Sequence, residues 1–220
     1  MVNLNSPKHR LITAVCFLVA FALAGAFWYM SRPNDVDQNS NITATGPETE
    51  CALDPTTIST LKVAAKGEVA AFVPMDRPYS VAHFSFKDAN GVSKTLADWS
   101  DRSVLINLWA TWCAPCRAEM PFLDQLQRTM GSDKFEVLPI SVDRGEPSKP
   151  KTFFKEIAIQ SMSFFHDGDA MTLNALKREG LALGLPATLL IDTRGCVIGR
   201  LNGPAEWASE DAQNLIKAGI

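Results

Sequence analysis

Hydrophobic and polar positions downstream of residue 50 alternate between the periods of buried strands and of helices. Residues 104–110 (VLINLWA) form an apolar run typical of a buried central strand, and apolar residues at 120, 123, 126 and 130 place a helical stripe on 113–130. Asn-Gly at 90–91 predicts a hairpin turn. The pattern further predicts strands over 82–86, 92–96, 135–142, 187–191 and 197–201, helices over 149–157, 170–177 and 206–217, and a short helix after Asp54-Pro55. A strand–helix–strand unit followed by a hairpin and a final helix predicts an α/β architecture.

The pattern near the N-terminus is different. Residues 11–30 are twenty positions without a charge, which is enough to cross a hydrocarbon core of about 30 Å at about 1.5 Å per residue. Lys8 and Arg10 precede this run, and only Arg32 follows it closely. The positive-inside rule then predicts a cytoplasmic N-terminus (1–10), one transmembrane anchor (11–30) in the inner membrane, and the rest of the chain in the periplasm.

Two other interpretations of this run stay open. Ala22-Leu23-Ala24 resembles the small-residue site at which a signal peptide is cleaved, although the run is long for a signal peptide. A lipoprotein would carry a small residue before its cysteine, whereas Val15 precedes Cys16, so we interpret Cys16 as an apolar residue in lipid. Residues 31–50 are polar without periodicity and predict a flexible linker, which leaves 51–220 as the folded domain.

Composition adds a limit on partners. The chain of 220 residues is 46% hydrophobic and 20% charged, as globular proteins are, and its formal net charge is -3. A mildly acidic protein repels phosphate backbones, so nucleic-acid binding is not expected. We expect the protein to act as a monomer.

The candidate chemistry lies at Trp112-Cys113-Ala114-Pro115-Cys116. A helix that begins at Cys113 has free N–H groups and about half a positive charge at its N-terminus, which favours a thiolate there. Cys116 lies three residues on and can close a disulfide with it. We expect Cys113 to be the exposed nucleophile and a buried Cys116 to resolve the mixed disulfide, with Pro115 stiffening the turn and Trp112 covering one side.

This chemistry needs no cofactor beyond the redox-active Cys113–Cys116 disulfide. The competing interpretation is half of a zinc site, which requires a second close pair of ligands. His83 and His166 stand alone in the sequence, so no metal is expected.

The sequence around the two cysteines can be compared with known families. The stretch VLINLWATWCAPCRAEMP at 104–121, together with LPAT at 185–188, resembles the TlpA/ResA/CcmG group of thioredoxin-like proteins, and most of all its TlpA-like members. The resemblance implies a thioredoxin-like fold, a central mixed β-sheet flanked by helices. It also implies a cis peptide bond at Pro186, with Leu185 and Ala187 pairing with a substrate strand beside Cys113.

Two further positions are compared with this family. Asn107 replaces the buried carboxylate of thioredoxin, which removes one candidate proton acceptor for Cys116. Glu119 follows Cys116 by three residues, where cytochrome-maturation members of the group also carry an acid, and it is a candidate proton shuttle. The alternative is that Glu119 is a solvated helix residue.

Cys51 and Cys196 lie outside the active motif, in the part of the chain that we place in an oxidising compartment. A bridge between them would hold the N-terminal segment against the far hairpin and close a very long loop. The alternative is a pair of unrelated, buried thiols. We expect the bridge.

The direction of the reaction is a further expectation. Ala114-Pro115 has no cation that would further stabilise the thiolate, so we expect a protein-disulfide reductase with a potential of roughly -200 to -270 mV, supplied with electrons by a membrane thiol carrier. The family likeness implies clients in cytochrome oxidase biogenesis, either a copper-delivery protein or the oxidase subunit with the copper centre. Apocytochrome c is the alternative client. A thioredoxin-fold copper chaperone and a peroxiredoxin are alternative functions, and this sequence has the cysteine spacing of neither.

Overall fold

The computed structural model describes residues 51–77 and 79–220. The expected cytoplasmic segment 1–10, anchor 11–30 and linker 31–50 lie outside the described residues. Within the described part of the chain, no helix is long and apolar enough to cross a membrane.

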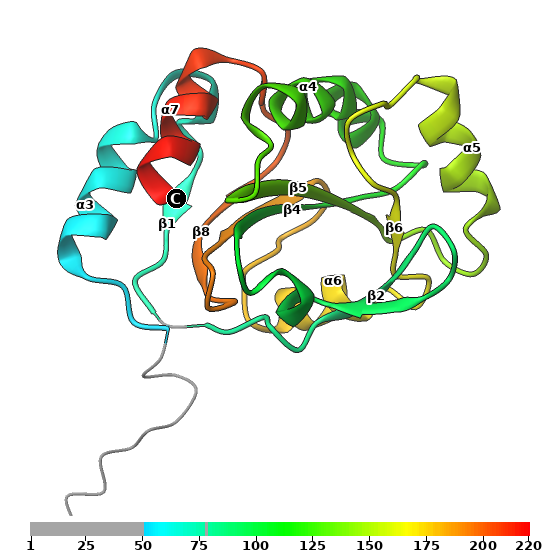
Figure 1. The fold of residues 1–220 in the computed structure, drawn as a ribbon, viewed down its shortest axis with the longest axis horizontal. Helices are drawn as coiled ribbons and strands as arrows, with labels where there is room; N and C mark the ends of the chain where they lie inside the picture. The colour runs from blue at the N-terminus through cyan, green and yellow to red at the C-terminus, as the bar shows by residue number, and fades with distance from the viewer. Residues whose placement is uncertain (1–50, 78) are drawn as a thin grey trace, which may run out of the picture. The chain divides into compact units, whose positions relative to one another are not determined.

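A central sheet of eight strands organises the domain, in the order β1-β8-β7-β4-β5-β6-β2-β3 (Figure 1). It is mixed, because β4 pairs in parallel with β5 and antiparallel with β7. The strands are β1 (Val73–Pro74), β2 (Ser85–Asp88), β3 (Ser93–Thr95), β4 (Ser103–Trp109), β5 (Phe135–Ser141), β6 (Phe165–His166), β7 (Ala187–Ile191) and β8 (Val197–Asn202).

Helices flank this sheet, with α4 above it and α6 below it in the view of Figure 1. The mixed sheet flanked by helices that the family resemblance implies is therefore confirmed. The α-helices are α3 (Pro55–Ala64), α4 (Ala114–Met130), α5 (Ser148–Glu156), α6 (Met171–Arg178) and α7 (Glu210–Gly219), with short 3-10 turns η1 (Gly67–Val69) and η2 (Leu96–Trp99).

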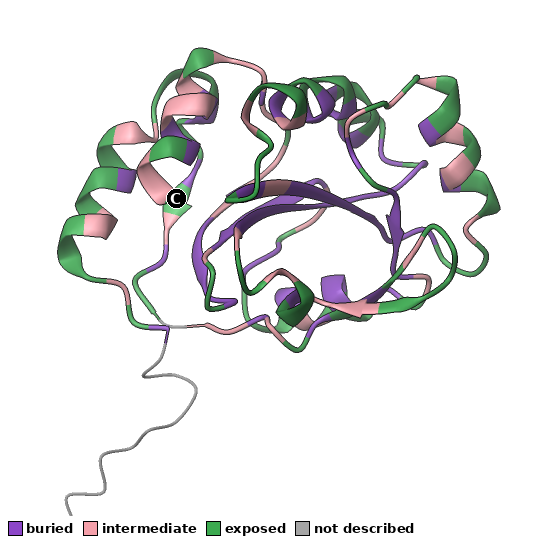
Figure 2. Ribbon diagram, viewed as in Figure 1, coloured by how far each residue is buried: buried purple, intermediate pink, exposed green. Residues whose placement is uncertain are grey.

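Strand β4 lies at the centre of the core, and every residue of it is buried, as the purple sheet in Figure 2 shows. Leu105, Ile106 and Leu108 have no exposed surface. A strand with neighbours on both sides and helices on both faces has no solvent face, so its side chains are apolar at consecutive positions. Ser103 and Asn107 are the polar exceptions; Ser103 begins the strand, and Asn107 belongs to the site described below.

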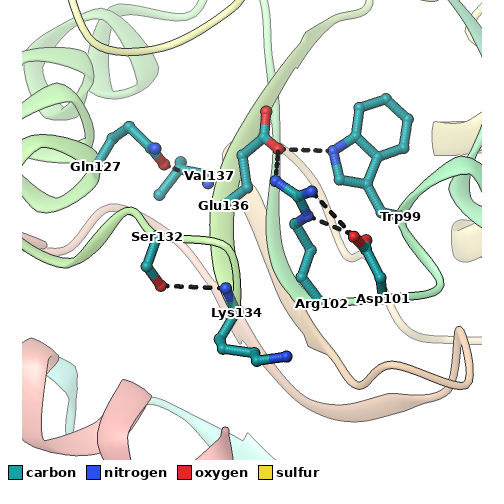
Figure 3. A network of polar contacts seen from close by, with 8 residues as sticks. All are labelled: Trp99, Asp101, Arg102, Gln127, Ser132, Lys134, Glu136 and Val137. Carbon is teal, nitrogen blue, oxygen red and sulfur yellow. Dashed lines mark hydrogen bonds and ion pairs between the residues drawn. The ribbon is translucent and has the colours of Figure 1, made fainter.

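A network of polar contacts lies where β4 and β5 begin, at the opposite end from the two cysteines (Figure 3). Glu136 accepts hydrogen bonds from the indole of Trp99 at 2.8 Å and from the guanidinium of Arg102 at 3.4 Å. Arg102 also pairs with Asp101 at 3.1 Å. These contacts join the segment before β4 to β5, so we assign the network to the scaffold.

Two strands of the structure are not predicted by the pattern. Strands β1 and β6 have two residues each, too few to show a period. The last helix begins at Glu210 instead of 206, because Ser209 caps it by accepting a hydrogen bond from the backbone N–H of Ala212 at 3.2 Å. Residues 205–208 are therefore loop, which matters for the site.

The end of α5 gives a stability prediction. The N–H of Ile159 donates to the carbonyl of Phe154 at 3.2 Å and that of Ala158 to Lys155 at 3.0 Å, the bonds of a Schellman motif. Ala158 occupies the left-handed position of this motif, with φ 52°. Left-handed backbone costs a non-glycine residue about 1–2 kcal/mol, whereas glycine loses about 0.5–1 kcal/mol more chain entropy on folding. Ala158→Gly should therefore raise the free energy of unfolding by about 0.5–1 kcal/mol, as measured by urea denaturation.

The matched control is Ala118→Gly, at an exposed position inside α4. This change should lower the free energy of unfolding by about 1 kcal/mol, because glycine disfavours a helix interior. Destabilisation by both changes would contradict the assigned role of Ala158.

Candidate active site

Cys113 and Cys116 form a disulfide at the start of α4. Cys113 is the N-cap of this helix, and its sulfur accepts a hydrogen bond from the backbone N–H of Cys116 at 3.3 Å. Strand β4 ends at Trp109, and the cysteine motif follows it at the N-terminus of α4. The free N–H groups of that N-terminus favour a thiolate. The structure therefore confirms that the two cysteines are close enough to form a disulfide at the start of this helix, as the sequence predicts.

The exposure of the pair differs from expectation. Cys116 is fully buried, as predicted, but Cys113 is also only 5% exposed. The sulfur of Cys113 is bonded to Cys116 and faces the first turn of α4, which leaves little of it in solvent. Trp112 is 66% exposed, so the indole stands out beside the disulfide.

Glu119 is buried on the first turns of α4, with 1% of its surface exposed, so its interpretation as a solvated helix residue is wrong. Its Oε1 accepts a hydrogen bond from Nδ2 of Asn107 at 2.7 Å, and its Oε2 accepts one from the backbone N–H of Ala205 at 3.2 Å. Burial raises the pKa of this carboxyl to about 7, and the hydrogen bond from Asn107 offsets part of that rise. A carboxyl with this pKa exchanges protons near neutral pH.

The contact between Asn107 and Glu119 shows that this site has a buried carboxylate even though asparagine replaces the one of thioredoxin. Asn107 lies on β4 where thioredoxin has a carboxylate, and here it holds a carboxylate that α4 supplies. Asn107 also donates to the hydroxyl of Thr188 on β7 at 2.9 Å. Glu119 and Cys116 are three residues apart, a spacing that puts them on one face of the helix.

The loop before β7 contains the predicted cis peptide bond, between Leu185 and Pro186. Ala187 is fully buried and pairs in register with Leu108 of β4 and with Asn202 of β8. The expectation that Ala187 pairs with a substrate strand is therefore wrong, because neighbouring strands occupy both of its sides. Leu185 is partly exposed and keeps that candidate role.

Asp143 is a site residue that the sequence reasoning missed. It is 6% exposed, and its carboxylate accepts hydrogen bonds from the backbone N–H of Thr111 at 2.8 Å and from the hydroxyl of Ser141 at 3.0 Å. Thr111 precedes the cysteine motif, so Asp143 holds the loop that carries Cys113. The signal was an acid directly after the strand predicted to end at 142, since parallel strands end at one sheet edge.

The other two cysteines are also joined. Cys51 and Cys196 form a disulfide across 145 positions, with their Cα atoms 5.2 Å apart. Both are buried, at 2% and 1% exposure. The predicted bridge is therefore present in the structure, and it holds the segment before α3 to the turn before β8.

The histidine and acidic side chains do not gather into a metal site in the described part of the chain. Among residues 51–77 and 79–220, no group of three or more histidine, cysteine, aspartate or glutamate side chains is arranged to hold a metal ion. Nε2 of His166 contacts the backbone carbonyl of Asp143 at 2.8 Å, so this ring belongs to the scaffold of the loop.

Several known proteins are similar to this chain in sequence. The family described as Redoxin matches residues 78–216. ResA of Bacillus subtilis (strain 168), named a thiol-disulfide oxidoreductase, is 29% identical over 138 residues, which cover 62% of this chain and 74% of the relative. The thioredoxin-like protein YneN of the same strain is 29% identical and covers 52% of this chain and 64% of its own length. ResA of Geobacillus thermodenitrificans (strain NG80-2) is 33% identical, with shares of 52% and 62%.

The chain thus spans just under two thirds of two of these relatives and about three quarters of the third. They confirm the resemblance to the TlpA/ResA/CcmG group at the level of the group.

Solved structures agree on the fold. A putative thiol:disulfide interchange protein DsbE from Chlorobium tepidum superposes with a TM-score of 0.56 at 23% identity, covering 66% of this chain and 98% of that one. A thioredoxin family thiol:disulfide interchange protein from Chlorobium tepidum TLS gives a TM-score of 0.53 at 26% identity, with shares of 66% and 99%. The domain therefore has the thioredoxin-like α/β fold.

Proposed function

The chain belongs to the redoxin family, and from this membership we propose that it is a thiol–disulfide oxidoreductase of the ResA/DsbE type that acts on disulfides of partner proteins. The observation that carries the proposal is the Cys113–Cys116 disulfide at the N-terminus of α4. Short disulfides at such positions are reactive, because the leaving thiolate is stabilised by the helix.

The reaction begins from the reduced pair. The Cys113 thiolate attacks one sulfur of a client disulfide, the client S–S bond breaks, and the other client sulfur leaves as a thiolate that takes up a proton. Cys116 gives its proton to Glu119 and attacks the sulfur of Cys113 in the mixed disulfide. The bond between Cys113 and the client breaks, and the second client sulfur leaves as a thiolate that takes up a proton. The products are a client dithiol and the Cys113–Cys116 disulfide, so two electrons have passed to the client.

We propose that the protein works as a reductant. The dipeptide Ala114-Pro115 between the cysteines carries no cation, which supports a potential of roughly -200 to -270 mV. The periplasm is kept oxidising, so the pair needs electrons from a membrane thiol carrier. An inner-membrane anchor at 11–30 and a linker at 31–50 would place the domain beside that carrier, in the periplasm.

The client class follows from the TlpA-like motifs. We propose a copper-delivery protein or the copper-binding subunit of cytochrome oxidase as the partner. Apocytochrome c is the second candidate, favoured by the acid at position 119, where cytochrome-maturation members also carry one. A copper-binding chaperone of this fold would need ligands beyond the two cysteines of the motif.

The division of labour between the cysteines tests the proposal. With a full-length Cys116→Ser variant, oxidised clients should accumulate as mixed disulfides on Cys113, because the resolving thiol is missing. Cys113→Ser should trap none, since Cys116 is fully buried. Non-reducing gels and mass spectrometry of membranes read both results.

The direction is read separately, by alkylating cells and measuring the potential of the pair. A mostly reduced pair, which becomes oxidised when the membrane thiol carrier is deleted, is expected of a reductant. A mostly oxidised pair with a potential of about -120 mV would identify an oxidase instead.

A further inference from the structure

A groove of about 550 Å³ lies against Trp112, the residue that precedes Cys113 of the active disulfide. The start of the β5–α5 loop and helix α6 contribute its walls, and Trp112 contributes the wall next to Cys113. Trp112 directly precedes Cys113 and is 66% exposed, so its indole offers an apolar surface at this groove. Leu173 and Val142, both buried, line the groove as well.

The charges around this groove are mostly positive. Arg144, Lys149 and Lys177 line it from three different elements, and all three are exposed. Among the residues that the structure describes, none of the three forms an ion pair. Unpaired cations that converge from separate elements leave a local field that an anionic partner can neutralise.

Two acids, Asp143 and Glu146, also line the groove, so its three cations exceed its acids by one. The carboxylate of Asp143 is buried and accepts hydrogen bonds from Thr111 and Ser141. Glu146 is the one exposed acid among the lining residues of this groove. The groove is therefore positive on a chain whose formal net charge is -3.

We propose that this groove binds an acidic segment of the client protein next to the client's reactive cysteine. The proposal rests on the proposed function and deepens it, because a chain seated against Trp112 presents its neighbouring disulfide to Cys113. The occupant is a protein segment, because it must carry a disulfide and because the groove offers an indole and buried apolar side chains in addition to charge. Electrostatic complementarity of this kind mainly raises the rate of association and selects among partners.

The test measures exchange rates of the full-length, reduced protein in detergent with three synthetic disulfide peptides. The peptides are identical except that the residues flanking the cysteine are Asp and Glu, Asn and Gln, or Lys. At low ionic strength we expect the acidic peptide to react about ten-fold faster than the Asn/Gln peptide, and the Lys peptide to react most slowly. The ten-fold ratio should shrink towards one in 0.5 M salt, since salt screens exposed charges.

Charge reversal assigns the effect to the groove. In Arg144→Glu/Lys177→Glu, the ratio of acidic to Asn/Gln rates should fall to one or below. The matched control, Lys62→Glu/Lys134→Glu, makes the same change in net charge at exposed positions away from the groove and should keep the wild-type ratio. A ratio of one in the wild type, or equal losses in both double variants, overturns the groove. Absence of reaction with every peptide would instead count against the proposed function.

Discussion

Glu119→Gln should slow the release of reduced client by about 100-fold or more at pH 7. Cys116 must lose a proton before it attacks the mixed disulfide, and positioned proton acceptors contribute about 10²–10⁴ in rate. Glu119 is the buried acid one helical turn from Cys116, and its pKa of about 7 suits that transfer. The decay of a mixed disulfide formed in a single turnover measures the release step directly. Glu68→Gln, at an exposed acid in η1, is the control and should leave the decay unchanged.

The same carboxyl predicts how stability depends on pH. Its pKa in the folded oxidised protein is raised from 4.5 to about 7, so the folded state holds a proton that the unfolded state has already lost. The wild type should therefore be most stable below about pH 4.5 with respect to this group, and should lose about 3 kcal/mol as the pH rises to about 7. Glu119→Gln removes this loss. The unfolding free energy of the wild type relative to that of the variant should therefore fall by about 3 kcal/mol between about pH 4.5 and 7. If Glu119→Gln changed neither the decay rate of the mixed disulfide nor the pH dependence of the unfolding free energy, Glu119 would be neither the proton shuttle nor a buried acid with a raised pKa.

Loss of the Cys51–Cys196 bridge should destabilise the domain by up to about 5 kcal/mol. The chain-entropy relation gives this figure for a loop of 145 positions, because the cross-link removes many open conformations from the unfolded chain. The variant is Cys51→Ser/Cys196→Ser, which leaves no unpaired thiol from this bridge. Urea unfolding of the oxidised proteins measures the change.

The active disulfide is the matched control for this experiment. It joins residues three positions apart, and the same relation gives it only about 2 kcal/mol. Cys113→Ser/Cys116→Ser should therefore cost about 3 kcal/mol less than removal of the long-range bridge. Equal losses from the two double variants would mean that burial of the new hydroxyls, and not loop closure, determines the effect.

The sequence predicted those parts of the molecule whose pattern is long or chemically distinctive. The apolar run around Leu105 extends along β4, and the apolar stripe on α4 extends over several helical turns. Both are long enough for their hydrophobic pattern to indicate the type of element. The cysteine motif was identified by its place between them. The bridge between Cys51 and Cys196 followed from the compartment expected of the chain.

Other features depend on contacts between distant segments, which no local pattern encodes. The burial of Glu119 arises because Asn107 on β4 and the backbone of Ala205 both approach it. The sequence did not show that the backbone of Ala187 pairs with strands on both sides, because those partners are known only from the sheet order. Asp143 was missed because its partner, Thr111, lies 32 positions away in the sequence.

The two outer strands of the sheet have a consequence for how other chains can attach. At one edge β1 has only two residues, and Pro74 provides no N–H to a further strand. At the other edge β3 has three residues, Ser-Lys-Thr, of which Lys94 carries a charge. Short, proline-bearing or charged edge strands are poor templates for strand addition, which disfavours edge-to-edge association of the domain. A client of the proposed oxidoreductase therefore gains little by extending the sheet at either edge.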